Sequence, residues 1–271
     1  MKLDHNSDII HKSKINLMIF TYYELKDNKN YLNQFFENSV IQVNKLIDKT
    51  ICKKALDYFL KNEPFLIGKY RKDSKGLVLD QYEDKSFIKY FEYPLSENFK
   101  IFGPFINNKT INLASNLLGC DVFLRSMEIH TRGSGSTEIP PHQDNGYYGL
   151  ENSDALTFYI ALNAQSAANG GLIYMPNKQG NEFLHKPSKS KAFSLSIDSI
   201  NLPENEKNFY PILEAGDCTI HHSNSVHFAN PIKKDNLERS VVVRLSFFST
   251  KTKIKKGHLD WYQKMLKANR G

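Results

Sequence analysis

The sequence is poor in cysteine and in long apolar runs, and both shortages narrow the class of protein. Its 271 residues contain three cysteines, none in a CxxC or paired spacing, which argues against a disulfide framework and a thiolate zinc site. No apolar run approaches the roughly 20 residues of a membrane span. Residues 1–13 are polar and lack the apolar segment of a secretory signal. We therefore expect a cytoplasmic protein with no membrane partner.

Arginine is also scarce, although the chain is basic. The net charge is +7 and the isoelectric point about 9.0, but most of the excess is carried by lysines scattered along the chain. Nucleic-acid binding usually relies on arginine clusters and aromatic platforms, and neither is visible. The one dense basic stretch, 251–256, is expected to be solvated surface. We expect no nucleic-acid partner and a small-molecule substrate, with which the positive charge makes an anionic group compatible.

The first part of the chain is predicted to be rich in helix, over residues 30–118. Apolar residues recur at helical spacing in 30–63, interrupted by the alternating segment Val40–Val43. Asp48 is placed to cap a second helix, and a further helix is expected from Thr110 to Leu118, ending at Gly119. The segment 64–100 shows no clean period and is assigned to loops and short strands.

From Asp121 onward, short β-branched and aromatic runs alternate with glycine, proline and asparagine. Such runs, without intervening helices, favour an antiparallel sandwich or barrel. They cover 121–130, 155–162, 171–175, 191–197, 209–213, 217–222 and 240–249. An amphipathic segment in 257–270 is predicted to form a closing helix. Because no linker is visible, residues 1–271 are interpreted as one domain, with 1–14 flexible and the β-core at 120–250.

The motif His142-Gln143-Asp144 follows two prolines and is a candidate metal site. On a strand, residues i and i+2 share a face, so His142 and Asp144 are expected to point the same way and Gln143 away. Two histidines and one carboxylate form a facial triad that leaves three adjacent iron positions open, enough for an oxo-acid and O₂. His-x-Asp also occurs by chance, and the alternative is a His and an Asp in a strand-end turn.

The third ligand has three candidates: His221, His222 and His227. A turn at Gly216-Asp217 launches a strand on which His221 and His222 face opposite ways, so at most one of them faces the metal. His227 follows the polar break 223–225, where the strand can bend. We select His227 as the ligand and interpret His222 as a second-shell or core histidine, with a structural role for His221.

Arg239 is predicted to anchor the far carboxylate of an oxo-diacid. A hairpin turning within the polar segment 230–236 would place Arg239 roughly opposite His227. The planar guanidinium suits a carboxylate through paired, charge-assisted hydrogen bonds. Arg244 is the competitor, but it has the opposite facing on a regular strand. The alternative for either arginine is a surface ion pair, for example with Glu238.

Taken together, these motifs resemble the phytanoyl-CoA dioxygenase family of Fe(II)- and 2-oxoglutarate-dependent oxygenases. The resemblance covers roughly residues 120–250 and rests on the order and spacing of several motifs. These are His142-Gln143-Asp144 with Tyr147 and Tyr148, Asn169-Gly170-Gly171-Leu172 with Pro176, Gly216-Asp217, His222 and His227 with four residues between them, and Arg239.

The resemblance implies a mainly β fold with flanking helices, a double-stranded β-helix or jelly roll of the cupin type. It implies Fe(II) held by His142, Asp144 and His227, with 2-oxoglutarate anchored by Arg239 and O₂ as the oxidant. The expected reaction hydroxylates a small molecule with release of succinate and CO₂. Tyr147 and Tyr148 are candidates to line the substrate mouth, with plain packing as the alternative for both tyrosines.

Two departures from the family pattern stand out. Asn177-Lys178-Gln179 replaces a frequent Gly-Ser-His or Gly-Thr-His, and Ala229 replaces the serine that commonly helps the arginine hold the oxo-acid. Asp144 is retained, whereas family halogenases lack this carboxylate, so hydroxylation is favoured. Two alternatives remain: a metal-binding jelly roll that acts as an isomerase, lyase or binding protein, and an oxygenase acting on a macromolecule. Substrate specificity is assigned to loops 64–100, 145–154 and 177–190.

Overall fold

The structure is a computed structural model that describes most of the chain. The described residues are 18–27, 30–72, 76–190, 193–198, 202, 208–232 and 239–268. The predicted flexible segment 1–14 lies outside them, as does most of the turn expected at 230–236. None of the helices in the described part combines the length and the apolar composition that a bilayer crossing requires.

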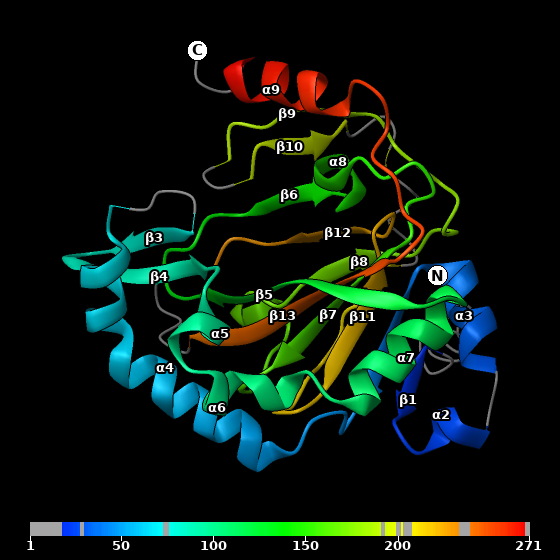
Figure 1. The fold of residues 1–271 in the computed structure, drawn as a ribbon. Coiled ribbons are helices and arrows are strands. Elements are labelled where there is room, and N and C mark those ends of the chain that lie inside the picture. The colour runs from blue at the N-terminus through cyan, green and yellow to red at the C-terminus, as the bar shows by residue number, and fades with distance from the viewer. Residues whose placement is uncertain are drawn as a thin grey trace, which may run out of the picture.

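The largest element of the structure is a sheet of eight strands, which lies between helices such as α4 (Lys49–Tyr70) and α6 (Phe99–Phe102) and a smaller sheet (Figure 1). All neighbouring strands are antiparallel except the first pair, which is parallel. In spatial order the strands are β1 (Ile19–Thr21), β2 (Val40–Asn44), β11 (Cys218–His222), β7 (Ala155–Ala161), β13 (Ser240–Ser249), β5 (Val122–Arg132), β4 (Lys85–Phe91) and β3 (Leu77–Tyr82).

A smaller sheet lies over one face of the large one (Figure 1). It consists of β6 (Ile139–His142), β12 (Val226–Ala229) and β8 (Ile173–Met175), and it is followed by the pair β9 (His185–Pro187) and β10 (Leu195–Ile197). The helix α9 (His258–Ala268) contacts β9. Two facing antiparallel sheets with helices at the flanks form the predicted jelly roll, so the fold class expected from the sequence is confirmed.

The two faces of the large sheet have different chemistry because side chains alternate along a strand. Met127 and Ile129 of β5 and Val241, Val243, Leu245 and Phe247 of β13 belong to the main apolar core on the helix side. That side is covered by helices including α4 and α6 (Figure 1). The residues that alternate with these face the smaller sheet, and they include Glu128 and Arg244. The interior between the two sheets is therefore partly polar.

The helices largely begin and end where the sequence predicts. Asp48 caps α4, since its carboxylate accepts a hydrogen bond from the Thr50 amide at 2.7 Å. The helix α7 (Asn108–Leu118) is capped by Asn107 and ends at Gly119, whose φ is +66°. The remaining helical turns are α2 (Glu24–Asp27), α3 (Asn30–Asn38), α5 (Pro94–Glu97), α8 (Asn145–Tyr148), η1 (Gly103–Phe105) and η2 (Ala167–Asn169).

Two of the local predictions are wrong in part. The segment 64–100 contains the short strands that were expected, since β3 and β4 pair as a hairpin, but it begins in a helix, because α4 continues through Pro64 to Tyr70. Residues 209–213 do not form a strand but make two isolated bridges, Phe209 with Tyr174 and Leu213 with Gln165.

Gly216 provides a test of the turn that launches β11. Its φ is +91°, and a Cβ there would lie 2.1 Å from the Ile47 carbonyl oxygen. We expect Gly216→Ala to lower the free energy of unfolding by more than about 1 kcal/mol, because both the backbone angle and the contact oppose it. The matched control is Gly68→Ala within α4, where nothing lies within 4 Å and about 0.5–1 kcal/mol of stabilisation is expected. Urea unfolding of both variants measures the difference, and equal effects would contradict the prediction.

Candidate metal centre

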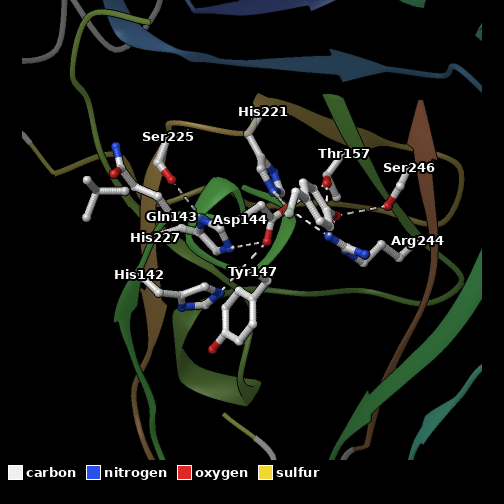
Figure 2. A network of polar contacts seen from close by, with 12 residues as sticks. His142, Gln143, Asp144, Tyr147, Thr157, His221, Ser225, His227, Arg244 and Ser246 are labelled. Carbon is white, nitrogen blue, oxygen red and sulfur yellow. Dashed lines mark hydrogen bonds and ion pairs between the residues drawn. The ribbon is translucent and has the colours of Figure 1, made fainter. Parts of the chain in front are cut away.

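Three buried side chains converge between the sheets and could hold a metal ion. One ligand atom from each of His142, Asp144 and His227 lies within 4.8 Å of the other two. Asp144 Oδ1 is 4.0 Å from His142 Nε2 and 3.8 Å from His227 Nε2. Two ligands sharing an ion at bond lengths near 2.1 Å are at most about 4.2 Å apart. The spacing therefore suits one shared ion, and Figure 2 shows both imidazoles turned toward the carboxylate.

Backbone carbonyls fix which imidazole nitrogen faces the centre. The Pro140 carbonyl lies 2.8 Å from His142 Nδ1, and the Ser225 carbonyl lies 3.0 Å from His227 Nδ1. A carbonyl only accepts, so each Nδ1 carries the proton and each Nε2 presents its lone pair. This carbonyl support is typical of histidine ligands to metals.

The strand arrangement differs from the predicted one in how Asp144 is delivered. His142 ends β6 and pairs directly with His227 on β12. Asp144, however, is not on the strand: its φ of −58° and ψ of −32° are helical, and it precedes α8. The prediction that His142 and Asp144 share a strand face is therefore wrong, although the turn brings both side chains to one place.

Gln143 and His185 hold this turn from outside. Gln143 points away from the centre, as predicted, and its side-chain amide donates to the carbonyls of Asn181 and Asn224. The backbone amide of Gln143 donates to His185 Nε2 at 3.0 Å. No local sequence pattern singled out His185, because its partner is 42 residues away.

Arg244 binds the side of Asp144 that faces away from the two histidines (Figure 2). Its Nη2 donates to Asp144 Oδ2 at 2.7 Å and to the Tyr148 hydroxyl at 2.6 Å, while Nη1 donates to Glu128 at 3.0 Å. Thr157 donates to the same Oδ2 at 2.7 Å. With Oδ2 occupied in this way, Oδ1 is the oxygen left for a metal.

These contacts set the protonation states at the centre. Burial acts to raise the pKa of Asp144, but the positive charge of Arg244 outweighs it and holds that pKa well below its usual value. Burial is also the main influence on the two histidines, and it lowers the pKa of His142 to about 3 and that of His227 to about 4. At neutral pH the centre thus offers two neutral imidazoles and one carboxylate, the forms that bind a metal cation.

His221 and His222 lie on opposite faces of β11, as their adjacency requires. His221 faces the centre, with Nε2 3.4 Å from Asp144 Oδ2 and Nδ1 3.0 Å from the Tyr174 hydroxyl. His222 lies on the other face, its ring centroid 6.4 Å from that of Phe35. Of the two roles considered for His222, this position fits a core histidine. The histidine that lies beside the candidate ligands is His221. Thr219, two residues before His221 on the same face of β11, is hydrogen-bonded to the same Tyr174 hydroxyl.

Arg239 does not lie beside the candidate metal ligands, and the hairpin that placed it there is wrong. The strand β12 pairs with β6 and β8, whereas β13 pairs with β5 and β7 in the opposite sheet. Arg239 instead forms a two-pronged ion pair with Glu63 of α4, both contacts being 2.7 Å. Its guanidinium lies over the rings of Phe59 and Phe87. Arg239 thus ties the large sheet to the helix layer.

The two tyrosines after Asp144 have different surroundings. The Tyr147 ring is 5.7 Å from that of His142, and its hydroxyl is hydrogen-bonded to the backbone of Leu195. Tyr148 packs on Phe248 and accepts a hydrogen bond from Arg244. Tyr147 therefore borders the centre, whereas Tyr148 supports Arg244 from within the interior.

Because Arg239 pairs with Glu63, replacing Arg239 should lower the free energy of unfolding and leave Fe(II) binding unchanged. The two side chains are 19% and 14% exposed, so we expect Arg239→Met to cost about 2–3 kcal/mol by leaving Glu63 unpaired. Lys53→Met is the control, because the Lys53–Asp57 pair is 74% and 60% exposed and its loss should cost less than about 0.5 kcal/mol. Chemical unfolding and Fe(II) binding are measured on both variants. Loss of Fe(II) binding in folded Arg239→Met would contradict this assignment.

The buried histidines predict how the metal-free protein responds to acid. Burial lowers the pKa of His142 to about 3 and those of His185, His222 and His227 to about 4. Their unfolded forms take up protons near pH 6.5, so the unfolded state binds more protons between these values. The free energy of unfolding should be at its full value above about pH 6.5 and should decrease as the pH falls toward 4. Each histidine contributes about 1.4 kcal/mol per pH unit within that window.

Urea unfolding at several values between pH 5 and 7 measures this slope. His222→Gln removes one of the four histidines without touching the candidate ligands, and it should reduce the slope by the share of one histidine. A stability that is flat across this range would contradict the prediction.

Comparison with known proteins agrees with this geometry. The model of the phytanoyl-CoA dioxygenase family matches residues 33–240. A protein of Stutzerimonas stutzeri described as "probable alpha-ketoglutarate-dependent hypophosphite dioxygenase" is 25% identical over 132 residues. That match covers 46% of this chain and 45% of the relative, so less than half of the relative's length is matched.

Solved structures share the fold at low sequence identity. AviO1 from Streptomyces viridochromogenes Tue57 has a TM-score of 0.60 at 12% identity, covering 82% of this chain and 95% of its own. EctD from S. alaskensis, solved with 2-oxoglutarate and 5-hydroxyectoine, has a TM-score of 0.62 at 14% identity, with coverages of 84% and 78%. The epimerase SnoN of nogalamycin biosynthesis reaches 0.59 at 17%, with coverages of 83% and 84%. Because the family model spans most of the sequence, the chain belongs to the phytanoyl-CoA dioxygenase family, and its cofactors are Fe(II), 2-oxoglutarate and O₂.

Proposed function

We propose that this protein hydroxylates a small molecule, with Fe(II) held by His142, Asp144 and His227. The observation that carries the proposal is the buried group of two neutral imidazoles and one carboxylate, whose ligand atoms are close enough to share one ion. Such a facial triad is the donor set of non-haem Fe(II) oxygenases and leaves positions for a co-substrate and O₂. The retained Asp144 favours hydroxylation over halogenation.

The bound iron with 2-oxoglutarate and O₂ supplies the oxidising power, and the protein supplies binding and orientation. Arg244 and Thr157 occupy Asp144 Oδ2, which directs Oδ1 to the iron as a single ligand atom. Glu128 neutralises the rest of the Arg244 charge. A one-oxygen carboxylate ligand keeps coordination positions free for the reactants.

Aromatic side chains border the His142 side of the centre, where we place the substrate. The ring centroids of Tyr147 and Phe193 are 5.7 Å and 5.6 Å from that of His142. These rings exclude water from the reacting position, as an oxidising centre requires. A small anionic substrate is supported by the net charge of +7 and by the relative named for hypophosphite.

The test measures succinate and a +16 product together. The parent protein should release succinate only when Fe(II) and 2-oxoglutarate are both supplied, and one member of a metabolite library should gain 16 mass units. His142→Ala should lower succinate release by more than about 100-fold, since a ligand is lost.

The matched control is His222→Gln, which changes a buried histidine on the opposite face of β11. This variant should bind Fe(II) and release succinate like the parent. Equal release from the parent and from His142→Ala would overturn the metal assignment. Succinate release with an oxidised but not hydroxylated product would overturn hydroxylation alone.

A further inference from the structure

The ion pair of Arg239 with Glu63 leaves open which cation holds the far carboxylate of 2-oxoglutarate. Both carboxylate oxygens of Glu63 are taken up by Arg239, and the pair lies between the large sheet and α4. Arg244 is also engaged, by the two carboxylates of Asp144 and Glu128. A third arginine, Arg132, differs from both because it forms no ion pair with a carboxylate among the described residues, although the charge of Asp80 acts on it from a greater distance.

Arg132 ends β5 and is buried, with 3% of its surface exposed. Its Nη2 donates to the carbonyls of Thr137 and Asn230, at 2.9 Å and 2.7 Å. Its Nε and Nη1 are buried without a hydrogen-bond partner among the described residues. Burial lowers the pKa of this guanidinium. A buried cation with free donors is costly unless an anion completes it.

The position of Arg132 fits an anion that reaches it from the candidate metal centre. Arg132 pairs with Ser240 of β13 and faces the interior between the sheets, on the same side of β5 as Glu128. The carbonyl of Asn230 that it binds follows Ala229, and Ala229 is two residues beyond His227. Two residues of strand advance about 7 Å, a distance suited to a five-carbon diacid that chelates the iron at one end.

Apolar and aromatic side chains lie close to Ala229 and His227. Ala229 packs in a cluster with Tyr159, Tyr174 and Val242, and the ring centroids of Tyr174 and His227 are 5.9 Å apart. Such side chains suit the two methylene groups of 2-oxoglutarate. Ala229 leaves no hydroxyl here to assist a carboxylate, so the cation must supply the polar contact.

Gly170 shows that the surroundings accommodate the Arg132 side chain. A Cβ at Gly170 would lie 2.9 Å from Arg132 Nε and 3.0 Å from its Cβ. The glycine of the Asn-Gly-Gly-Leu motif thus makes room for this arginine. This contact gives the motif a structural role that the sequence alone did not reveal.

We infer that Arg132, and not Arg239, binds the far carboxylate of 2-oxoglutarate. A carboxylate placed there gives the unpaired guanidinium a charge-assisted partner, and it orients the keto-acid end toward the iron. The inference rests on the iron site of the proposed function. It moves the co-substrate anchor from the residue before β13 to the end of the neighbouring strand β5.

The test compares 2-oxoglutarate with 2-oxopentanoate, which has the same length and keto-acid end but a methyl group in place of the far carboxylate. Both acids are titrated into the Fe(II)-loaded protein without oxygen, and binding is followed by the iron-to-oxo-acid charge-transfer absorption. The parent should prefer 2-oxoglutarate. In Arg132→Met this preference should fall on the order of 10- to 100-fold, and Arg132→Lys should keep an intermediate preference.

Arg239→Met is the matched comparison and should keep the preference of the parent. The ratio of two affinities reports only on folded, iron-loaded protein, so a loss of stability does not imitate the effect. The assignment would be overturned if Arg132→Met kept the full preference for 2-oxoglutarate, or if only Arg239→Met lost it. A parent protein that binds both acids equally would overturn it as well. Hydroxylation is not needed for this readout, so intact binding without a +16 product would count against the proposed function alone.

Discussion

The ion-paired cluster around Arg244 is the interaction on which the candidate centre depends. One buried guanidinium joins Asp144 to Glu128, and the positive charge keeps both carboxylates ionised despite burial. Breaking a buried pair leaves an uncompensated charge, which costs several kcal/mol. The cluster therefore fixes the Asp144 carboxylate in position, and the two histidines on β6 and β12 meet the oxygen that remains free.

The jelly roll explains why this cluster can form. The alternation along β5 and β13 sends apolar side chains to the helices and polar side chains to the interior. The polar residues Glu128 and Arg244 are direct neighbours across the two strands. The smaller sheet then brings His142 and His227 over them. The smaller sheet and the turn after β6 supply the candidate ligands, and the large sheet supplies the residues that hold Asp144 in place.

Much of the fold could be predicted because it follows from local patterns. The cap Asp48, the helix end at Gly119 and most β-runs after residue 120 were visible as short-range signals, whereas the helix expected from Thr110 begins at Asn108 and is capped by Asn107. The predicted hairpin between His227 and Arg239 was wrong because it assumed that two consecutive strands pair in one sheet. Nothing in the sequence near these residues argues against such pairing. In this fold β12 and β13 lie in opposite sheets, so a plausible turn sequence at 230–236 predicted the wrong partner for Arg239.

The sequence by itself determined the donor set, the order of the motifs and the family, since these depend on residue types and spacing. Only the tertiary structure decided whether His221 or His222 faces the interior and how the chain turns at Asp144. It also decided which groups Arg132, Arg239 and Arg244 contact. Those choices depend on contacts between segments up to 176 residues apart. The role of a charged side chain in a dry interior depends on the group that the fold places beside it. Spacing along the chain does not specify that neighbour.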